Sequence, residues 1–162
     1  MSVSDYSSEK FHEFINTLKA TPSELLKQSK FISEEQSILK PSPKEWCYKE
    51  VVVHMLSCSS LWSNSIHLML SLNNPVITFV HPNKYYPKTG WLSLKITDLI
   101  KLYTLNRKEF IYSIEGLSLK KIERTGIIKE RTHSVYSQVR RMALHELNHK
   151  NQLQRTAENA RT

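Results

Sequence analysis

Long segments with apolar residues at helical spacing constrain this chain more than any other feature. Glycine occurs only 3 times and proline 6 times in 162 residues, so few residues interrupt these segments. We therefore expect an all-α fold, a single four-helix-bundle domain over residues 1–162, which is long enough to bury one core. The helical segments are predicted at residues 7–19 and 22–30, 45–70, 93–117, and from 132 or 134 to Ala160.

The break between the first two segments is predicted from local capping signals. Thr21, Ser23 and Glu24 surround Pro22 in the pattern of a helix N-terminus, with proline at the first helical position. A short separate helix should therefore begin near residue 22. Residues 33–35 could open a further turn, and the prolines of the connector 40–44 stop it before the second long helix.

The connection over residues 71–91 predicts the topology. A helix of about 25 residues is roughly 37 Å long, and twenty-odd extended residues reach roughly 70 Å. The chain can therefore cross the whole bundle, so that the second and third long helices run parallel in an up-down-down-up arrangement. The alternative is that this long loop is a lid. Residues 77–80 could form an extended piece, but no partner strand is predicted for it, and residues 119–131 are interpreted as a charged linker.

The charge and the segments that are missing limit the classes of partner. The net charge is +8, but the basic residues are scattered and no recognition-helix, zinc-finger or RNA-binding signature accompanies them. An anionic small-molecule substrate explains this charge equally well, and nucleic acid is disfavoured.

We expect no membrane span, because there is no uncharged apolar run of about 18 residues. Residues 1–14 lack the apolar region of a secretory signal. Cys47 and Cys58 form no disulfide framework, so a cytoplasmic location is expected; a homodimer stays open.

Three histidines suggest a metal site. His145 and His149 are four residues apart on the last helix, so their imidazoles share one face, with about 6 Å between Cβ atoms. His54 lies on the inward stripe of the second long helix beside Val51 and Met55. Three histidine ligands would leave one coordination position open, as in catalytic zinc sites. The alternative is a set of partly buried histidines that bind no metal.

Three other side chains could support this site. Glu50 is one turn before His54 and could accept a hydrogen bond from the distal N–H of its ring, or form an ordinary surface pair. Cys58 is one turn after His54 and is either a core residue or a ligand. Gln152 could hydrogen-bond a bound water or ligand. His67 is about 220° around the helix from His54, so it should point elsewhere.

Two motifs together resemble those of the DinB-like (YfiT-like) proteins. In residues 43–56 a Pro-x-x-Trp leads into a helix, followed by Glu50 and then His54; in residues 143–153 H-x-x-x-H is followed by x-x-Gln. The order of these motifs along nearly the whole chain is also similar. Cys47 is a departure, since serine is common after the tryptophan, but this is not a ligand position.

The resemblance implies both a fold and a site. It implies a left-handed up-down-down-up bundle in which His54, His145 and His149 bind zinc, nickel or another divalent ion. Members of known activity are often thiol S-transferases or related isomerases that use low-molecular-weight thiols, and the resemblance does not imply DNA binding. We therefore expect a metal-dependent thiol S-transferase or hydrolase acting on a small molecule. The alternative is a non-catalytic basic helical protein that binds an anionic ligand or nucleic acid.

Overall fold

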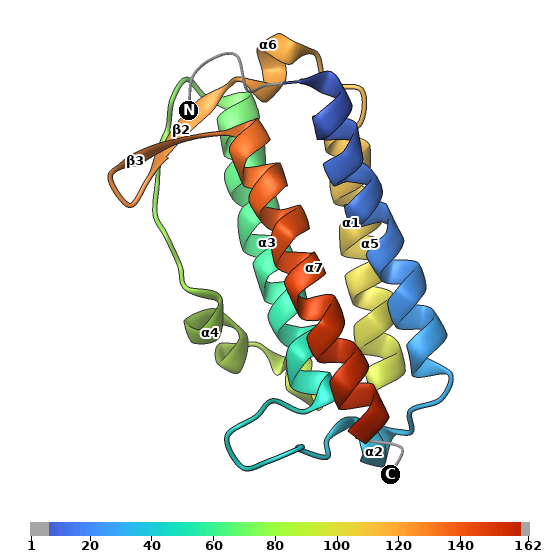
Figure 1. Cartoon of the computed structure of the whole chain (residues 1–162). Helices are drawn as coiled ribbons and strands as arrows, with labels where there is room; N and C mark the ends of the chain where they lie inside the picture. Colours follow the sequence, from blue (N-terminus) through green and yellow to red (C-terminus); the bar gives the residue numbers. More distant parts are fainter. Residues whose placement is uncertain (1–6, 160–162) are drawn as a thin grey trace.

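Four long helices build the bundle (Figure 1). The computed structural model describes residues 7–159. The long helices are α1 (Ser8–Ser29), α3 (Tyr48–Ser71), α5 (Ile96–Ile114) and α7 (Val135–Asn159). Helices α1 and α3 each pack against both α5 and α7. The all-α prediction is confirmed, and the end predicted at Ala160 lies outside the described residues.

The direction of each helix confirms the predicted topology. Ser59 Oγ donates to Asn106 Oδ1 at 2.5 Å, and His67 Nε2 lies 2.8 Å from Ser113 Oγ. These pairs are 47 and 46 residues apart, and such a constant separation means that α3 and α5 run parallel. In Figure 1, α1 and α7 both run in the opposite direction. The bundle is therefore up-down-down-up.

The crossover between α3 and α5 contains short elements of its own. These are β1 (Val76–Ile77), the one-turn helix α4 (Pro82–Tyr85) and two 3-10 turns, η2 (Tyr86–Lys88) and η3 (Gly90–Ser93). The turns pack against α3 and cover its first half. The third long helix accordingly begins at Ile96, later than predicted, because residues 90–93 form the turn η3.

A small sheet corrects two expectations for the connections. The segment predicted as a charged linker forms the one-turn helix α6 (Leu119–Ile122) and the hairpin β2 (Thr125–Ile128) and β3 (Arg131–Ser134). Strand β1 pairs with β2 in parallel, so Ile77 of the expected extended piece does have a partner, whereas residues 78–80 form no strand. Gly126 allows this close approach, because an added Cβ would lie 3.2 Å from both Ile77 Cδ1 and the Pro75 carbonyl oxygen. Local sequence does not reveal such pairing between distant two- to four-residue strands.

The predicted break at Pro22 is wrong, because α1 continues through it. Proline inside a helix costs about 3 kcal/mol, since it removes one backbone hydrogen bond and crowds the preceding turn. Leu18, Pro22 and Leu25 are nevertheless buried on one face of α1, and packing of this face against the bundle offsets that cost. The turn expected after residue 33 forms as α2 (Glu34–Ser37), with Ser33 and Gln36 in a capping box.

The core consists of two hydrophobic clusters, one toward each end of the bundle. One contains Cys58, Trp62 and Met142, and the other contains Met55 and Leu153. Polar groups that meet where these clusters join are shielded from most of the surrounding water. In the described part of the chain, no helix is long and apolar enough to cross a membrane.

Candidate metal centre

The antiparallel pair α3 and α7 brings the predicted histidines together. His54 on α3 is only 8% exposed, and its Nε2 lies 3.2 Å from His145 Nε2 on α7. His149, one turn further along α7, places its Nε2 3.0 Å from the same His145 nitrogen. The spacing of four residues therefore does align the two α7 imidazoles, as the sequence predicted.

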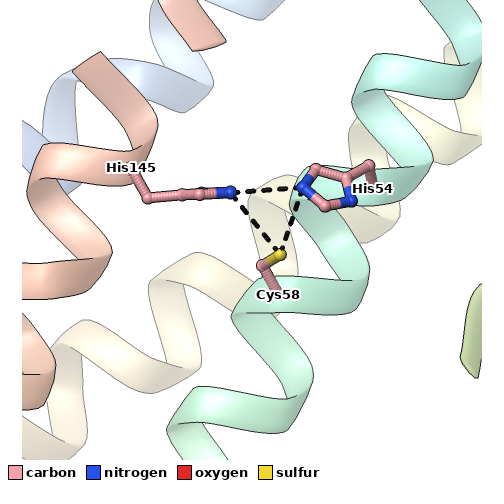
Figure 2. Close-up of side chains that lie close together, drawn as sticks. All are labelled: His54, Cys58 and His145. Atoms are coloured by element: carbon pink, nitrogen blue, oxygen red, sulfur yellow. Dashed lines mark hydrogen bonds between the residues drawn. The ribbon is translucent and has the colours of Figure 1, made fainter. Parts of the chain in front are cut away.

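Cys58 is the fourth member of this group. Its Sγ lies 3.5 Å from His54 Nε2 and 3.7 Å from His145 Nε2, and Figure 2 shows the three side chains pointing toward one another. The ligand atoms of His54, Cys58 and His145 all lie within 4.8 Å of one another. We call His54, Cys58, His145 and His149 the imidazole cluster.

The spacing of these atoms fits a transition-metal ion. Zinc bonds of about 2.1 Å to nitrogen and 2.3 Å to sulfur, in tetrahedral geometry, separate two nitrogens by roughly 3.4 Å and nitrogen from sulfur by roughly 3.6 Å. The observed separations of 3.2 and 3.0 Å between nitrogens and 3.5 and 3.7 Å to sulfur are close to these values. Nitrogen and sulfur donors also suit zinc, nickel and related ions. His54, Cys58 and His145 could therefore hold a divalent metal ion, and His149 meets this group at His145.

Burial keeps these groups in defined protonation states. Desolvation, together with the neighbouring His149, lowers the pKa of His54 to about 4, and desolvation with the neighbouring histidines lowers that of His145 to about 3. Desolvation also lowers the pKa of His149. At neutral pH the three rings are therefore uncharged and can offer nitrogen lone pairs. Burial raises the pKa of the Cys58 thiol to about 12, so without a metal it stays protonated.

Gln152 positions one ring of the cluster. His149 Nδ1 lies 2.7 Å from Gln152 Oε1, which can only accept, so Nδ1–H is the donor. The lone pair of His149 is then on Nε2, the nitrogen that faces His145. The sequence suggests that Gln152 could bond a bound water or ligand, whereas in the structure its amide oxygen bonds the imidazole itself. Such partners commonly fix the orientation of a metal-binding histidine.

Glu50 does not contact His54, contrary to one of the two interpretations of its position. Its Oε2 accepts from the backbone N–H of Cys47 at 2.9 Å, and its Oε1 pairs with Lys40 at 3.0 Å. Glu50 is the third residue of α3, where a carboxylate can reach back to the cap and satisfy an otherwise free donor. Within residues 7–159, His54 Nδ1 is buried with no hydrogen-bond partner.

Two tryptophans enclose the imidazole cluster. The Trp46 ring centroid is 4.8 Å from that of His54 and 6.5 Å from that of His149. Trp62 meets His145 edge to face at 4.9 Å. The sequence indicated Trp46 only through its place in the motif, and Trp62 only as an apolar residue of the second long helix. His67 instead lies near Ser113, away from the cluster, as its angular position predicted.

A second buried polar group, which the sequence did not indicate, lies on a different face of α7. Arg107 is 1% exposed and forms an ion pair with Glu146, which is 3% exposed. Tyr103 donates its hydroxyl to Glu146 Oε1 at 2.8 Å. We call these three residues the ion-pair cluster. The only signal was the position of Glu146 between the two histidines of the H-x-x-x-H motif.

Comparison with known proteins supports the fold assignment. No protein-family model matches the chain, and neither does any curated protein sequence. Among solved structures, YfiT from Bacillus subtilis superposes with a TM-score of 0.85 at 12% identity, covering 98% of this chain and 92% of YfiT. YfiT is described as "a probable metal-dependent hydrolase with an unusual four-helix bundle topology". The DinB-like protein YjoA, also from Bacillus subtilis, gives a TM-score of 0.66 at 16% identity, covering 91% of this chain and 90% of YjoA.

A third solved structure is longer than this chain. The mycothiol-dependent maleylpyruvate isomerase gives a TM-score of 0.66 at 10% identity, covering 89% of this chain but 59% of the isomerase. At these identities the likenesses establish the fold. The chain therefore has the DinB/YfiT-like four-helix-bundle fold that the sequence resemblance predicted.

Proposed function

We propose that this protein is a metal-dependent hydrolase of a small molecule, with His54, His145 and His149 holding a zinc or nickel ion. One observation carries the proposal: the Nε2 atoms of His54 and His149, from two antiparallel helices, both lie close to His145 Nε2, at 3.2 and 3.0 Å, and all three imidazoles are uncharged. A divalent ion bound there would lower the pKa of a water molecule and give a nucleophile near neutral pH. Hydrolysis is preferred because the described activity of YfiT, which covers nearly all of this chain, is of that kind.

The protein's own residues would perform the supporting steps. Gln152 holds His149 in the tautomer whose Nε2 faces the cluster. Trp46 and Trp62 cover the rings of His54 and His145 and keep bulk water away from them. Exclusion of water strengthens electrostatic interactions at the reacting atoms.

A thiol-dependent transfer or isomerisation is the second candidate. It is supported by the likeness to the mycothiol-dependent maleylpyruvate isomerase, which covers 89% of this chain. A low-molecular-weight thiol would then take the place of the water molecule as the nucleophile. Turnover that requires an added thiol would favour this candidate, and turnover in buffer alone would favour hydrolysis.

Cys58 decides whether such a site is open or closed. If the thiolate were a fourth ligand, four protein ligands would complete a tetrahedron, as in structural zinc sites. We propose that Cys58 lies beside the ion without ligating it, so that one position stays open for water. Burial raises the pKa of its thiol and opposes ionisation, whereas a bound cation would favour the thiolate. The Cys58→Ala variant should then retain its metal, and cobalt-loaded protein should lack a thiolate-to-cobalt absorption band. Loss of the metal in this variant, or the presence of that band, would instead indicate a closed site.

Metal binding by single-histidine variants tests the proposal directly. His54→Ala, His145→Ala and His149→Ala should each weaken zinc binding at least a hundredfold, as measured by competition with a chelator. His67→Ala is the matched control, since His67 is also on α3 but bonds Ser113. It should bind zinc like the unmodified protein. Equal zinc binding by all four variants would exclude the site.

A further inference from the structure

A basic cavity of about 420 Å³ lies between the β2–β3 hairpin and α7, outside the imidazole cluster. Ligand-binding pockets typically have volumes of this order. Basic side chains line it from strand β3, from the turn between β2 and β3, and from α7. Its lining residues are Phe79, Ile128, Lys129, Arg131, His133 and Arg141.

Among the described residues, the cations of this cavity have no acidic partners. Other basic residues of the bundle, such as Lys49 and Arg107, pair with carboxylates. Within residues 7–159, no ion pair joins Lys129, Arg131 or Arg141 to a carboxylate. Lys129 and Arg141 instead lie over aromatic rings, which leaves their charge uncompensated. Like charges repel, so their collection around one cavity favours an anionic ligand.

A smaller cavity of about 90 Å³, lined by both apolar and polar residues, adjoins the basic one. The two share the lining residues Phe79, Ile128 and Arg141, so they lie side by side. Gln138 lines the smaller cavity and is only 1% exposed. Its Nε2 is buried and has no hydrogen-bond partner in the described part of the chain. A buried amide that lacks an acceptor is unfavourable, and an acceptor atom on a ligand would satisfy it.

Trp62 separates this cavity pair from the imidazole cluster. Its ring lies 5.2 Å from the Arg141 guanidinium carbon, and on the other side meets the His145 ring at 4.9 Å. Arg141 and His145 are also four residues apart on α7. The positive charge of Arg141 accordingly contributes to the lowered pKa of His145. The two sites are therefore neighbours that communicate electrostatically, although different residues form them.

We propose that the two cavities together bind a phosphate monoester. The phosphate group would lie between Arg141, Arg131 and Lys129, with His133 at its edge. Three cations suit a doubly charged phosphate better than a singly charged carboxylate, and the forked guanidinium groups match its oxygens. The uncharged part of the ligand would lie against Phe79, where one of its acceptor atoms takes the hydrogen bond from Gln138. This binding site does not require a metal in the imidazole cluster.

Calorimetric titration of the full chain with phenyl phosphate, inorganic phosphate and benzoate tests the proposal. Phenyl phosphate should bind most tightly, since it has both a phosphate and an apolar part, and benzoate should bind least. Arg141→Gln should weaken phenyl phosphate binding tenfold or more, which corresponds to the loss of one charge-assisted hydrogen bond. Arg140→Gln is the matched control, because Arg140 is an exposed neighbour on α7 that does not line either cavity.

The His145→Ala variant separates this proposal from the metal site. Phosphate can also bind to a metal ion, so binding that disappears in His145→Ala would belong to the imidazole cluster and overturn the proposal. Equal losses in Arg141→Gln and Arg140→Gln would mean nonspecific attraction to the basic protein and would also overturn it. Tighter binding of benzoate than of phenyl phosphate would exclude the phosphate assignment. Retained binding in His145→Ala, with a selective loss in Arg141→Gln, is the expected result.

Discussion

His145 and Glu146 are adjacent on α7, yet their side chains enter two buried groups of opposite character. Glu146 belongs to the ion-pair cluster, where Arg107 compensates its charge and Tyr103 donates a hydrogen bond to it. His145 belongs to the imidazole cluster, whose members are uncharged at neutral pH because burial lowers the pKa of the rings and raises that of the thiol. One group combines opposite charges, whereas the other combines similar neutral donors.

This difference separates a structural role from a binding role. A buried carboxylate and guanidinium neutralise each other's charge and form hydrogen bonds with each other. Arg107 Nε and Glu146 Oε2 nevertheless remain without hydrogen-bond partners among the described residues. Nitrogen atoms that face each other at 3.0 and 3.2 Å need a proton between each pair, or a cation that all of them share. The ion-pair cluster should therefore stabilise the folded chain, and the imidazole cluster should bind a ligand.

The largest expected effect comes from breaking the ion-pair cluster. Arg107→Met leaves the Glu146 carboxylate buried without its partner, which should lower the free energy of unfolding by about 3–5 kcal/mol. The double variant Arg107→Met, Glu146→Leu should recover most of this loss, because it removes both charges. Urea denaturation followed by circular dichroism measures both values. A loss below about 1 kcal/mol in the single variant would contradict a structural role.

Metal removal should have the next largest effect, without unfolding the chain. Loss of a saturating metal should lower the free energy of unfolding by roughly 3–4 kcal/mol, the linkage expected for a ligand that binds only the folded state. A bundle of this length has its own core and should keep its helices. Thermal melts of metal-loaded and chelated protein, monitored by far-UV circular dichroism, provide the test. Unfolding by chelator at room temperature would show that the ion is structural.

Acid should destabilise the metal-free protein through the imidazole cluster. The folded-state pKa values of about 4 for His54 and about 3 for His145 lie below the value of about 6.5 for histidine in an unfolded chain. The unfolded chain therefore binds more protons below pH 6.5, and stability falls as the pH decreases toward 4. The loss should be on the order of 2 kcal/mol at pH 5 for each of the two rings.

The double variant His54→Gln, His145→Gln provides the control for this pH dependence. Its free energy of unfolding, measured by urea denaturation without metal, should vary less between pH 7 and pH 5 than that of the unmodified protein. The same slope in both proteins would assign the acid sensitivity to other groups.

The smallest expected effect concerns the orientation of His149. Gln152→Ala removes the acceptor for His149 Nδ1–H, and it should weaken zinc binding about tenfold, as for other partners of metal-binding histidines. Stability without metal should change little. Gln154→Ala is the matched control, because Gln154 bonds Glu158 on the exposed side of α7. Equal zinc affinities in the two variants would show that Gln152 does not position the ring.

Periodicity along the sequence predicted most of the bundle and the histidines of the candidate site. The period of 3.6 residues places His145 and His149 on one face, and it places His54 on the inward stripe of its helix. The length of the crossover predicted that α3 and α5 run parallel, because backbone geometry limits how far a chain can reach. These properties depend on local geometry, which is the same wherever such a segment occurs.

Only the tertiary structure decided which polar atoms meet. Cys58 joins the imidazole cluster because α7 packs against its face of α3, and Glu50 caps its own helix instead of orienting His54. The ion pair of Arg107 with Glu146 joins residues 39 apart, and β1 pairs with β2 across fifty residues of chain. Pro22 stays within a helix because the buried face of α1 outweighs a local preference. In each case the deciding energy is a contact between distant segments, which no local pattern contains.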